Sequence, residues 1–362
     1  MRVLQLCHSY YPPFLDCARQ YAALFKGTQY QVTTVYLQGN FSQEVVEGSA
    51  SEEVIFLGYK SSQIGGLKLG AISKIKALCK KNEFSFCIAH RVKSTYVALL
   101  ATHLPIISVH HNYNDYSRWS RRLLVNYYQN RLLMLGVSNS VRDDLRRDLK
   151  GWPDDRIQTL YNRIDVDAVR SSLVSRVEAR NALGISQNAW VVGNVGRLHR
   201  DKDQATLIRG FVQALPNLPA ESLLVIIGAG SLEAKLKAQV AAANATHSIR
   251  FLGNVPHAAR YFKAFDTFAL TSDNEPFGMV LLEAMVAEVT VICSDNGGGA
   301  EVVNGVGTLF SFGHADQLAT VLINILRNSK PTYFDVLQQQ FSDVAAKKRF
   351  WHLYQTVVIP NV

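Results

Sequence analysis

Short apolar runs alternate with helical patterns along the whole chain, which is typical of α/β domains built on parallel sheets. In the first half, β-rich runs lie at 2–6, 32–36, 54–56, 86–89, 106–109 and 132–137, with helical patterns at 18–25 and 141–149. A second series has runs at 190–195, 223–227, 249–252, 267–271 and 289–293, with helices predicted at 204–215, 232–243, 258–265 and 317–328. We therefore expect an α/β fold of two doubly wound domains that face a central cleft.

The polar turn Asn162-Arg163-Ile164-Asp165 separates the two series. It predicts a first domain over 1–165 and a second domain over 166–342. A last helical run rich in Lys, Arg and aromatic residues follows at 343–354.

Composition predicts a globular cytoplasmic protein. The chain has 362 residues and a mean hydropathy of +0.02. No run approaches the ~20 apolar residues that span a bilayer, and the apolar run at 1–6 is too short for a signal peptide. Five cysteines without a C-x-x-C pair indicate reduced thiols and no zinc site. We expect no metal and no other cofactor.

The net charge of +9 is carried almost entirely by the first half of the chain. Residues 1–165 hold 21 Lys and Arg against 13 Asp and Glu, whereas the remainder holds 17 against 16. The segments 67–81 and 116–131 mix cations with apolar and aromatic residues such as Trp119. This mixture favours contact with an anionic membrane or acceptor, although a plain solvated face stays open. No nucleic-acid motif is present, so we expect no nucleic-acid partner.

The stretch from Glu275 to Glu283 carries the densest candidate chemistry. Two carboxylates flank an apparent helix start, where Pro276 suits the first turn and Gly278 permits close approach of a ligand. The first amides of such a helix favour anions. Acids that hold sugar hydroxyls beside a phosphate site would suit a nucleotide sugar, while a buried helix with an exposed acidic edge is the alternative.

Two cations follow the strand predicted at 190–195. Arg197 and Lys202 lie five residues apart and could hold a diphosphate, the first as a fork and the second as a point charge. A salt-bridged loop is the alternative. Asp201 and Asp203 match a metal pattern only at dipeptide scale, and we do not assign a metal to them.

Two further motifs have weaker claims. Gly228-Ala-Gly230 resembles the start of a dinucleotide fingerprint, but Glu233 replaces the third glycine, so NAD binding is not expected. His110 and His111 follow the strand at 106–109 and could donate to a sugar hydroxyl or a leaving phosphate. One of the two is expected to face the site, since successive residues of a strand point to opposite sides; a structural histidine is an equal alternative.

Taken together, the chain resembles the retaining family-four glycosyltransferases of GT-B fold, of the type that builds bacterial surface polysaccharide and lipopolysaccharide. The resemblance covers most of the chain, is strongest over 132–307, and rests on the order of its pieces. These pieces are 137–141, 161–165, 195–198 with Lys202, 227–230, 251–253, 275–283, and Gly297-Gly298 with Glu301. It implies two Rossmann-like domains around a cleft, with a helix in 343–362 that crosses back to the first domain.

The resemblance also implies roles for individual residues. Arg197 and Lys202 would hold the donor diphosphate, Glu275 would contact the donor sugar, and His110 would be the cleft histidine. Backbone amides near Phe277, Gly278, Met279 and Val280 would assist, and Glu283 would bind the ribose hydroxyls. The implied reaction is transfer from a nucleotide-sugar donor to a glycan or glycolipid acceptor with retention of configuration and without a metal. The basic first domain adds the expectation of peripheral contact with the inner face of the cytoplasmic membrane.

One departure concerns the acceptor side. The family usually has a glycine pair in the loop after the first strand, where this chain has Asp16-Cys17, and Arg163 replaces another usual glycine. The acceptor is therefore left open, as are the donor's base and sugar. Two other functions also stay open: a nucleotide-sugar epimerase of the same fold, and a non-catalytic glycan-binding relative.

Overall fold

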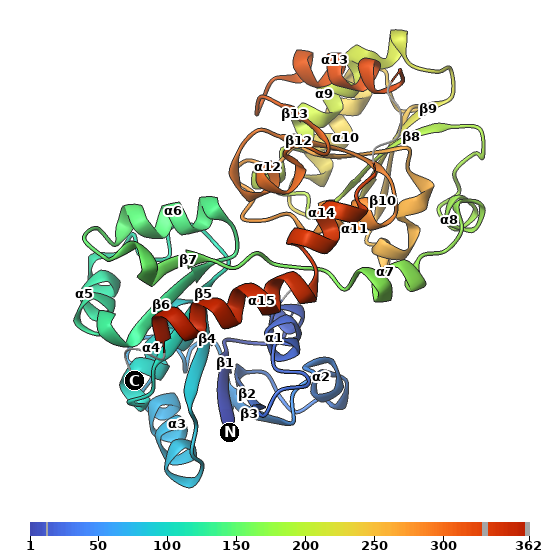
Figure 1. Cartoon of the computed structure of the whole chain (residues 1–362). Coiled ribbons are helices and arrows are strands. Elements are labelled where there is room, and N and C mark those ends of the chain that lie inside the picture. The colour runs from blue at the N-terminus through green and yellow to red at the C-terminus, as the bar shows by residue number, and fades with distance from the viewer. Residues whose placement is uncertain (12–13, 328–331, 359–362) are drawn as a thin grey trace. The chain divides into compact units, whose positions relative to one another are not determined.

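The computed structural model describes residues 1–11, 14–327 and 332–358. It divides into two compact units, the first formed by Met1–Asn162 with Asp343–Val362 and the second by Arg163–Ser342 (Figure 1). Each unit is built on one fully parallel sheet with helices packed around it. The two-domain α/β fold predicted from the sequence is confirmed.

The sheet of the first unit has seven strands in the order β3-β2-β1-β4-β5-β6-β7. They are β1 (Arg2–Cys7), β2 (Gln31–Gln38), β3 (Glu53–Tyr59), β4 (Phe86–His90), β5 (Ile106–His110), β6 (Leu132–Gly136) and β7 (Ile157–Thr159). Every residue of β4, β5 and β6 is buried. Burial on both faces explains why these strands read as continuous apolar runs rather than as alternating ones.

Helices cover this sheet on both sides (Figure 1). They are α1 (Phe14–Ala23), α2 (Gln43–Gly48), α3 (Leu69–Lys81), α4 (Arg91–Ala101), α5 (Trp119–Tyr127), α6 (Asn139–Asp148) and α15 (Asp343–Leu353). Asp16 and Cys17, expected in a loop, lie instead in the first turn of α1.

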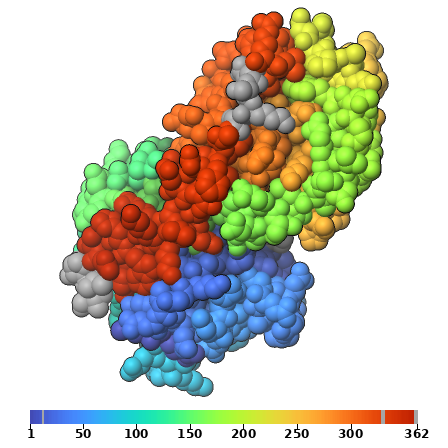
Figure 2. Space-filling model, turned by 45° about the vertical axis from the view of Figure 1, so that its right-hand side comes forward, coloured from blue at the N-terminus to red at the C-terminus, as the bar shows by residue number. Residues whose placement is uncertain are grey.

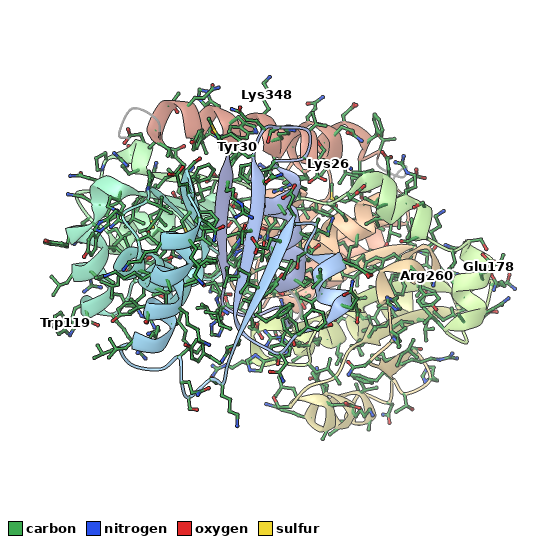
Figure 3. The ribbon with its side chains drawn as sticks, turned by 90° about the horizontal axis from the view of Figure 1, so that it is seen from below. Lys26, Tyr30, Trp119, Glu178, Arg260 and Lys348 are labelled. Carbon is green, nitrogen blue, oxygen red and sulfur yellow. The ribbon has the colours of Figure 1, made fainter. Side chains whose placement is uncertain are left out.

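Helix α15 belongs to the first unit although it follows the second unit in the chain. The Phe350 and Phe25 rings lie 5.4 Å apart, Lys347 Nζ donates to the Lys26 carbonyl, and Trp351 Nε1 donates to the Leu24 carbonyl. Figure 2 shows this late segment in red against the blue surface of the first unit, and Figure 3 shows Lys26 and Tyr30 beneath the same helix. Aromatic packing therefore ties a late segment to the earliest strands.

The sheet of the second unit has six strands in the order β10-β9-β8-β11-β12-β13. They are β8 (Trp190–Val195), β9 (Ser222–Ile227), β10 (Ile249–Gly253), β11 (Thr267–Leu270), β12 (Thr290–Ser294) and β13 (Thr308–Phe310). The helices are α7 (Val166–Ser172), α8 (Arg176–Ala182), α9 (Gln204–Ala214), α10 (Glu233–Ala242), α11 (Met279–Val286), α12 (Gly297–Val303), α13 (Ala315–Ile325) and α14 (Phe334–Gln340). The helix expected at 258–265 is a 3₁₀ helix, η5 (Ala258–Ala264).

The direction of strand addition reverses once in each sheet, between β1 and β4 and between β8 and β11. At such a point the crossovers leave to opposite sides, and a crevice opens at the carboxyl ends of the two strands. The residues that follow β1, β4, β8 and β11 are therefore placed for ligand binding.

We predict that Phe350→Ala destabilises the first unit by about 3–5 kcal/mol, because it empties a fully buried aromatic site. Hydrogen exchange followed by peptide should show lost protection in 1–162 and retained protection in 163–342. Val344→Ala, at a position on the same helix that is 77% exposed, is the control. Loss of protection confined to the second unit would contradict the packing described here.

Candidate functional site

The candidate donor residues of the second unit follow the two strands at its reversal point. Arg197 and Lys202 come after β8, and Glu275 comes after β11, its neighbour in the sheet. The two exits are tied together, since Thr271 Oγ1 donates to the Lys202 carbonyl at 3.0 Å and Asp273 N donates to the Asp201 carbonyl at 2.8 Å. The sheet thus brings together side chains that are more than seventy positions apart, as |i−j| = 73 for Lys202 and Glu275.

Lys202 and Glu275 form an ion pair, with Nζ and Oε2 2.5 Å apart. Their side chains are 19% and 11% exposed, so the pair is largely shielded from water. Screening by solvent is weak in such a place, and loss of either partner would leave a charge poorly compensated. The pair therefore presents a cation and an acid that are held at fixed positions beside one another.

Arg197 lies nearer to solvent. Its side chain is 73% exposed, and its Nη2 atom lies 3.4 Å from Asp201 Oδ2. Partial burial alone would raise the pKa of Asp201, but the hydrogen bond from His199 and the neighbouring cations Lys202 and Arg197 lower it. The structure thus pairs Arg197 with Asp201, and it leaves the guanidinium accessible to an anion from solvent.

Helix α11 begins three residues later than expected. Gly278 is its N-cap with φ 92°, a left-handed conformation that glycine adopts without strain, and Met279 is the first helical residue. Pro276 therefore precedes the helix, which corrects its expected place in the first turn. The amides that open α11 belong to Met279 and Val280, and they lack intrahelical acceptors by helix geometry.

The remaining predicted donor residues occupy different positions around α11. Phe277 is 2% exposed and its ring lies 5.8 Å from that of Phe341, so it can offer a ligand its backbone but not its side chain. Glu283 lies in the second turn of α11 and is half-buried. Glu275 lies in the loop that follows β11, whereas Glu283 lies within α11, so the two acids come from different elements.

Glycines in α12 allow a close approach to Glu275. Gly298 N donates to the Glu275 carbonyl at 2.7 Å, and a Cβ on Gly299 would lie 3.0 Å from Cys293 Sγ and 3.4 Å from Glu275 Cβ. The expected glycine loop at 297–299 is therefore the first turn of a helix. Its glycines position the Glu275 backbone by packing.

The Gly228-Ala-Gly230 motif has a structural explanation. A Cβ on Gly228 would lie 2.0 Å from the Gly196 carbonyl oxygen, and one on Gly230 would lie 2.3 Å from that of Leu198. The turns after β8 and β9 are thus packed backbone against backbone, which only glycine permits. This packing supports the conformation of the loop that carries Arg197.

In the first unit, His110 is an interior residue. Its side chain is fully buried, its Nδ1–H donates to Asp115 Oδ2 at 2.7 Å, and its Nε2 lies 2.8 Å from Ser108 Oγ. Both ring nitrogens thus have partners within the unit. Its role in catalysis remains a prediction, and a substrate could reach the ring only by exchanging one of these hydrogen bonds.

His111 is the more accessible of the two rings. It is half-buried, its Nε2 lies 3.2 Å from His90 Nδ1, and its Nδ1 lies 3.7 Å from Cys17 Sγ. Burial, with the neighbouring His110 and Arg91, lowers the pKa of His111 to about 3 against a smaller opposing effect of Asp115, so the ring is neutral at pH 7. Such a ring can accept or donate one hydrogen bond.

Sequence reasoning missed His8, His90 and Arg91, which lie at the exits of β1 and β4. Their positions in the sequence could have identified them, because each residue ends or directly follows a strand at the reversal point of the sheet. The helix α4, which starts at Arg91, was also missed because no polar turn separates it from β4.

Neither a metal site nor a membrane span is found in the described ranges. Within 1–11, 14–327 and 332–358, no group of three or more His, Cys, Asp or Glu side chains could hold a metal ion. In that same part of the chain, every helix is too short or too polar to cross a bilayer.

Two family models match the chain in succession. Residues 15–168 match "Glycosyltransferase Family 4", and residues 175–346 match "Glycosyl transferases group 1". Together they cover both units.

Curated relatives match over shorter stretches. The N-acetylgalactosamine-N,N'-diacetylbacillosaminyl-diphospho-undecaprenol 4-alpha-N-acetylgalactosaminyltransferase of Campylobacter jejuni is 26% identical over 64% of this chain and 63% of its own length. The lipopolysaccharide core biosynthesis mannosyltransferase LpcC of Rhizobium leguminosarum is 34% identical over 31% of this chain and 33% of its own length. The matched part thus spans less than two thirds of these relatives.

Solved structures show the same fold along nearly the whole chain. Anabaena HepE, in complex with UDP, has a TM-score of 0.81 at 19% identity and covers 98% of this chain and 100% of its own. The lipopolysaccharide outer core galactosyltransferase WaaB has a TM-score of 0.74 at 18% identity and covers 100% of both chains.

We predict that replacing His111 mainly affects turnover, whereas replacing His110 mainly affects stability. His111→Ala should reduce turnover and cost less stability than His110→Ala, because its ring is half-buried at a strand exit and is not fully enclosed. His110→Ala should lower the free energy of unfolding by about 1–3 kcal/mol, because it strips Asp115 and Ser108 of a buried partner. Thermal unfolding and turnover should be measured on both variants; a stable but inactive His110→Ala would place His110 itself in catalysis.

Proposed function

Because the chain belongs to the family-four glycosyltransferases of GT-B fold, we propose that it transfers a sugar from a nucleotide diphosphate sugar to an acceptor hydroxyl. Transfer would retain the anomeric configuration and use no metal or other cofactor. The observation that carries the proposal is the shielded Lys202–Glu275 pair at the reversal point of the second sheet. A nucleotide sugar needs both a cation for its diphosphate and an acid for its sugar hydroxyls.

Lys202 would stabilise the departing diphosphate. The diphosphate would compete with Glu275 for the ammonium group, and the freed carboxylate would then accept hydrogen bonds from the donor sugar. Arg197, accessible at the same strand exit, would add a forked contact to the phosphates. Charge that develops on the leaving group would thus meet groups that are already in place, which is an effective form of catalysis.

The opening of α11 would complete the donor site. The amides of Met279 and Val280 would bind a phosphate oxygen, with Gly278 and the Phe277 backbone allowing its approach. Glu283, one turn further along α11, would hold the ribose hydroxyls. The solved relative HepE is a UDP complex, so UDP-sugars are the first donors to test.

The acceptor is proposed to be a glycan or glycolipid at the cytoplasmic face of a membrane. The names of the relatives support this choice, since one acts on a diphospho-undecaprenol saccharide and another builds lipopolysaccharide core.

Helix α5 supplies a surface for that membrane contact. Trp119, Leu123 and Tyr127 lie at i, i+4 and i+8 and are 68%, 58% and 83% exposed, so they form one apolar stripe. Trp119 points outward in Figure 3. Arg118 and Arg122 flank the stripe, and aromatic residues with arginines suit the interface of an anionic leaflet.

Transfer is tested with Lys202→Ala and Glu275→Gln. Each should lower turnover by about 10²–10³-fold, because each removes a preorganised group at the donor. Lys237→Ala, which breaks an exposed ion pair in the same unit, is the matched control and should leave turnover unchanged. Wild-type turnover in either site variant would refute the assignment of these residues.

Product analysis tests the reaction type. Product should require the acceptor, whereas an epimerase would convert the donor alone and a binding relative would leave it intact. The anomeric signals of the product in an NMR spectrum should report retention, and turnover should survive a metal chelator.

Membrane contact is tested by replacing Trp119, Leu123 and Tyr127 together with Ser. Binding to vesicles of phosphatidylcholine and phosphatidylglycerol should fall by about tenfold or more, given the apolar surface that is lost. A second triple variant, Val177→Ser, Phe334→Ser and Val344→Ser, removes apolar side chains elsewhere that are 56%, 57% and 77% exposed, and it should bind normally. Equal binding of the two triple variants would exclude α5 as the membrane surface.

A further inference from the structure

Four cations gather around the first turn of α4 in the first unit. We call Lys68, Arg91, Lys93 and Arg121 the four-cation cluster. All four are half-buried, and they come from α4, from α5 and from the residue that caps α3. The cluster is thus assembled by the fold from three separate segments.

The cluster lies where the first sheet reverses its direction of strand addition. His8 directly follows β1, Arg91 directly follows β4, and the two strands are neighbours, with Leu6 opposite Ala89. Ligands of open α/β sheets bind at this kind of position. In the second unit the equivalent position carries Lys202 and Glu275.

The side chains of the cluster are held by neutral groups. The Arg91 guanidinium lies 4.9 Å from the Phe14 ring, and its Nη2 atom lies 3.1 Å from the terminal amide of the Asn112 side chain. Lys68 Nζ lies 4.4 Å from the Tyr96 ring. Arg121 donates to the Asp115 carbonyl at 2.8 Å. Aromatic faces and amide or carbonyl oxygens fix the positions of these cations without neutralising them.

None of the four cations is in a direct ion pair within the described residues, whereas Lys202 and Arg197 in the second unit each are. Burial and the neighbouring cations Lys93 and Arg121 lower the pKa of Lys68, and burial with Arg91 and Arg121 lowers that of Lys93. Partly desolvated like charges repel one another, and a bound anion would relieve that repulsion.

Unpartnered buried atoms provide a second, independent observation. His90, the residue before Arg91, is 4% exposed, and its Nε2 atom has no hydrogen-bond partner. His8 Nδ1 is likewise buried without a partner, and burial with Lys93 and Arg91 lowers the pKa of His8 to about 4. The unpartnered His8 nitrogen belongs to a ring that lies close enough to Lys93 and Arg91 for them to lower its pKa, so a polar atom with unused hydrogen-bonding capacity lies beside the cluster.

We infer that the four-cation cluster binds a phosphoryl group of the acceptor substrate, an inference that rests on the proposed glycosyltransferase function. Several cations with a guanidinium fork suit a phosphate or diphosphate, which carries more charge than a carboxylate. Arg91 and Lys93 also open an eleven-residue helix, whose first amides favour an anion. The phosphoryl group belongs either to a lipid-linked saccharide or to a free sugar phosphate.

Inorganic pyrophosphate is the first probe, titrated by calorimetry into full-length protein that carries Lys202→Ala so that the donor site is disabled. Adding Arg91→Gln and Lys93→Gln should weaken pyrophosphate binding by about tenfold or more, since two charge-assisted contacts are lost. The matched control adds Lys80→Gln and Lys81→Gln, two exposed lysines at the other end of α3, and should bind like the parent. Equal affinity of the two variants would overturn the inference.

Folding and ligand source need their own arms. Circular dichroism should first show whether the variant with Arg91→Gln and Lys93→Gln is folded. If that variant is unfolded, a variant with Lys68→Gln and Lys93→Gln takes its place in the titration, because it keeps the contact between Arg91 and Phe14. Tighter binding of farnesyl diphosphate than of glucose 6-phosphate would support a lipid-linked acceptor, and the reverse order a free sugar phosphate. Binding of neither probe would overturn the inference.

This binding test is independent of transfer. Pyrophosphate can bind the cluster whether or not the protein transfers sugar, so a failed transfer assay leaves the titration interpretable. Conversely, a protein that transfers sugar and yet binds pyrophosphate equally in both variants would retain the proposed function and lose only the phosphoryl site.

Discussion

Parallel strand pairing is the constraint on which both units depend. Strands that run in one direction must be joined by crossovers, and these crossovers bury both faces of the sheet. Polar groups that must meet a ligand are then confined to the loops and helix starts at the carboxyl edge. Arg197, Lys202 and Glu275 lie where strand addition reverses in the second unit, next to β8 and β11, and His8 and Arg91 lie at the equivalent point of the first unit, next to β1 and β4.

The two edges handle charge in opposite ways. In the second unit, Lys202 is paired with Glu275 and Arg197 with Asp201, so cation and acid compensate one another. In the described part of the first unit, Lys68 faces the Tyr96 ring and other cations, Lys93 faces other cations, and neither forms an ion pair with an acid. An anion that binds the second unit would displace an acid from its cation, whereas an anion that binds the first unit would pair with cations that have no ion-pair partner.

Sequence reasoning was accurate where the physical signal is local. Apolar runs predicted the central strands, since residues buried on both faces leave an unbroken pattern in β4, β5 and β6. The strand exits that carry Arg197, Lys202 and Glu275 were also located correctly along the chain.

Other features depend on tertiary contacts, and sequence reasoning could not recover them. The start of α11 depends on the left-handed Gly278, and the helical glycines at 297–299 depend on packing against Glu275. The adjacent histidines look equivalent in the sequence. In the structure, His110 is buried and hydrogen-bonded to Asp115, whereas His111 is only half-buried. The four-cation cluster has no linear motif, because its members converge only when α4 and α5 pack beside the start of α3.

The place of α15 has a consequence for the order in which the chain acquires structure during synthesis. The second unit is one continuous segment, 163–342, whereas the first is interrupted by it and requires residues from 343 onward. On the ribosome the second unit can close as soon as it emerges. The first unit is synthesised earlier, but the side of its core that contains Phe25 stays uncovered until Phe350 has been synthesised and packs against it. The earlier unit is then the later one to mature, and it is the one exposed to chaperones and proteases in the interval.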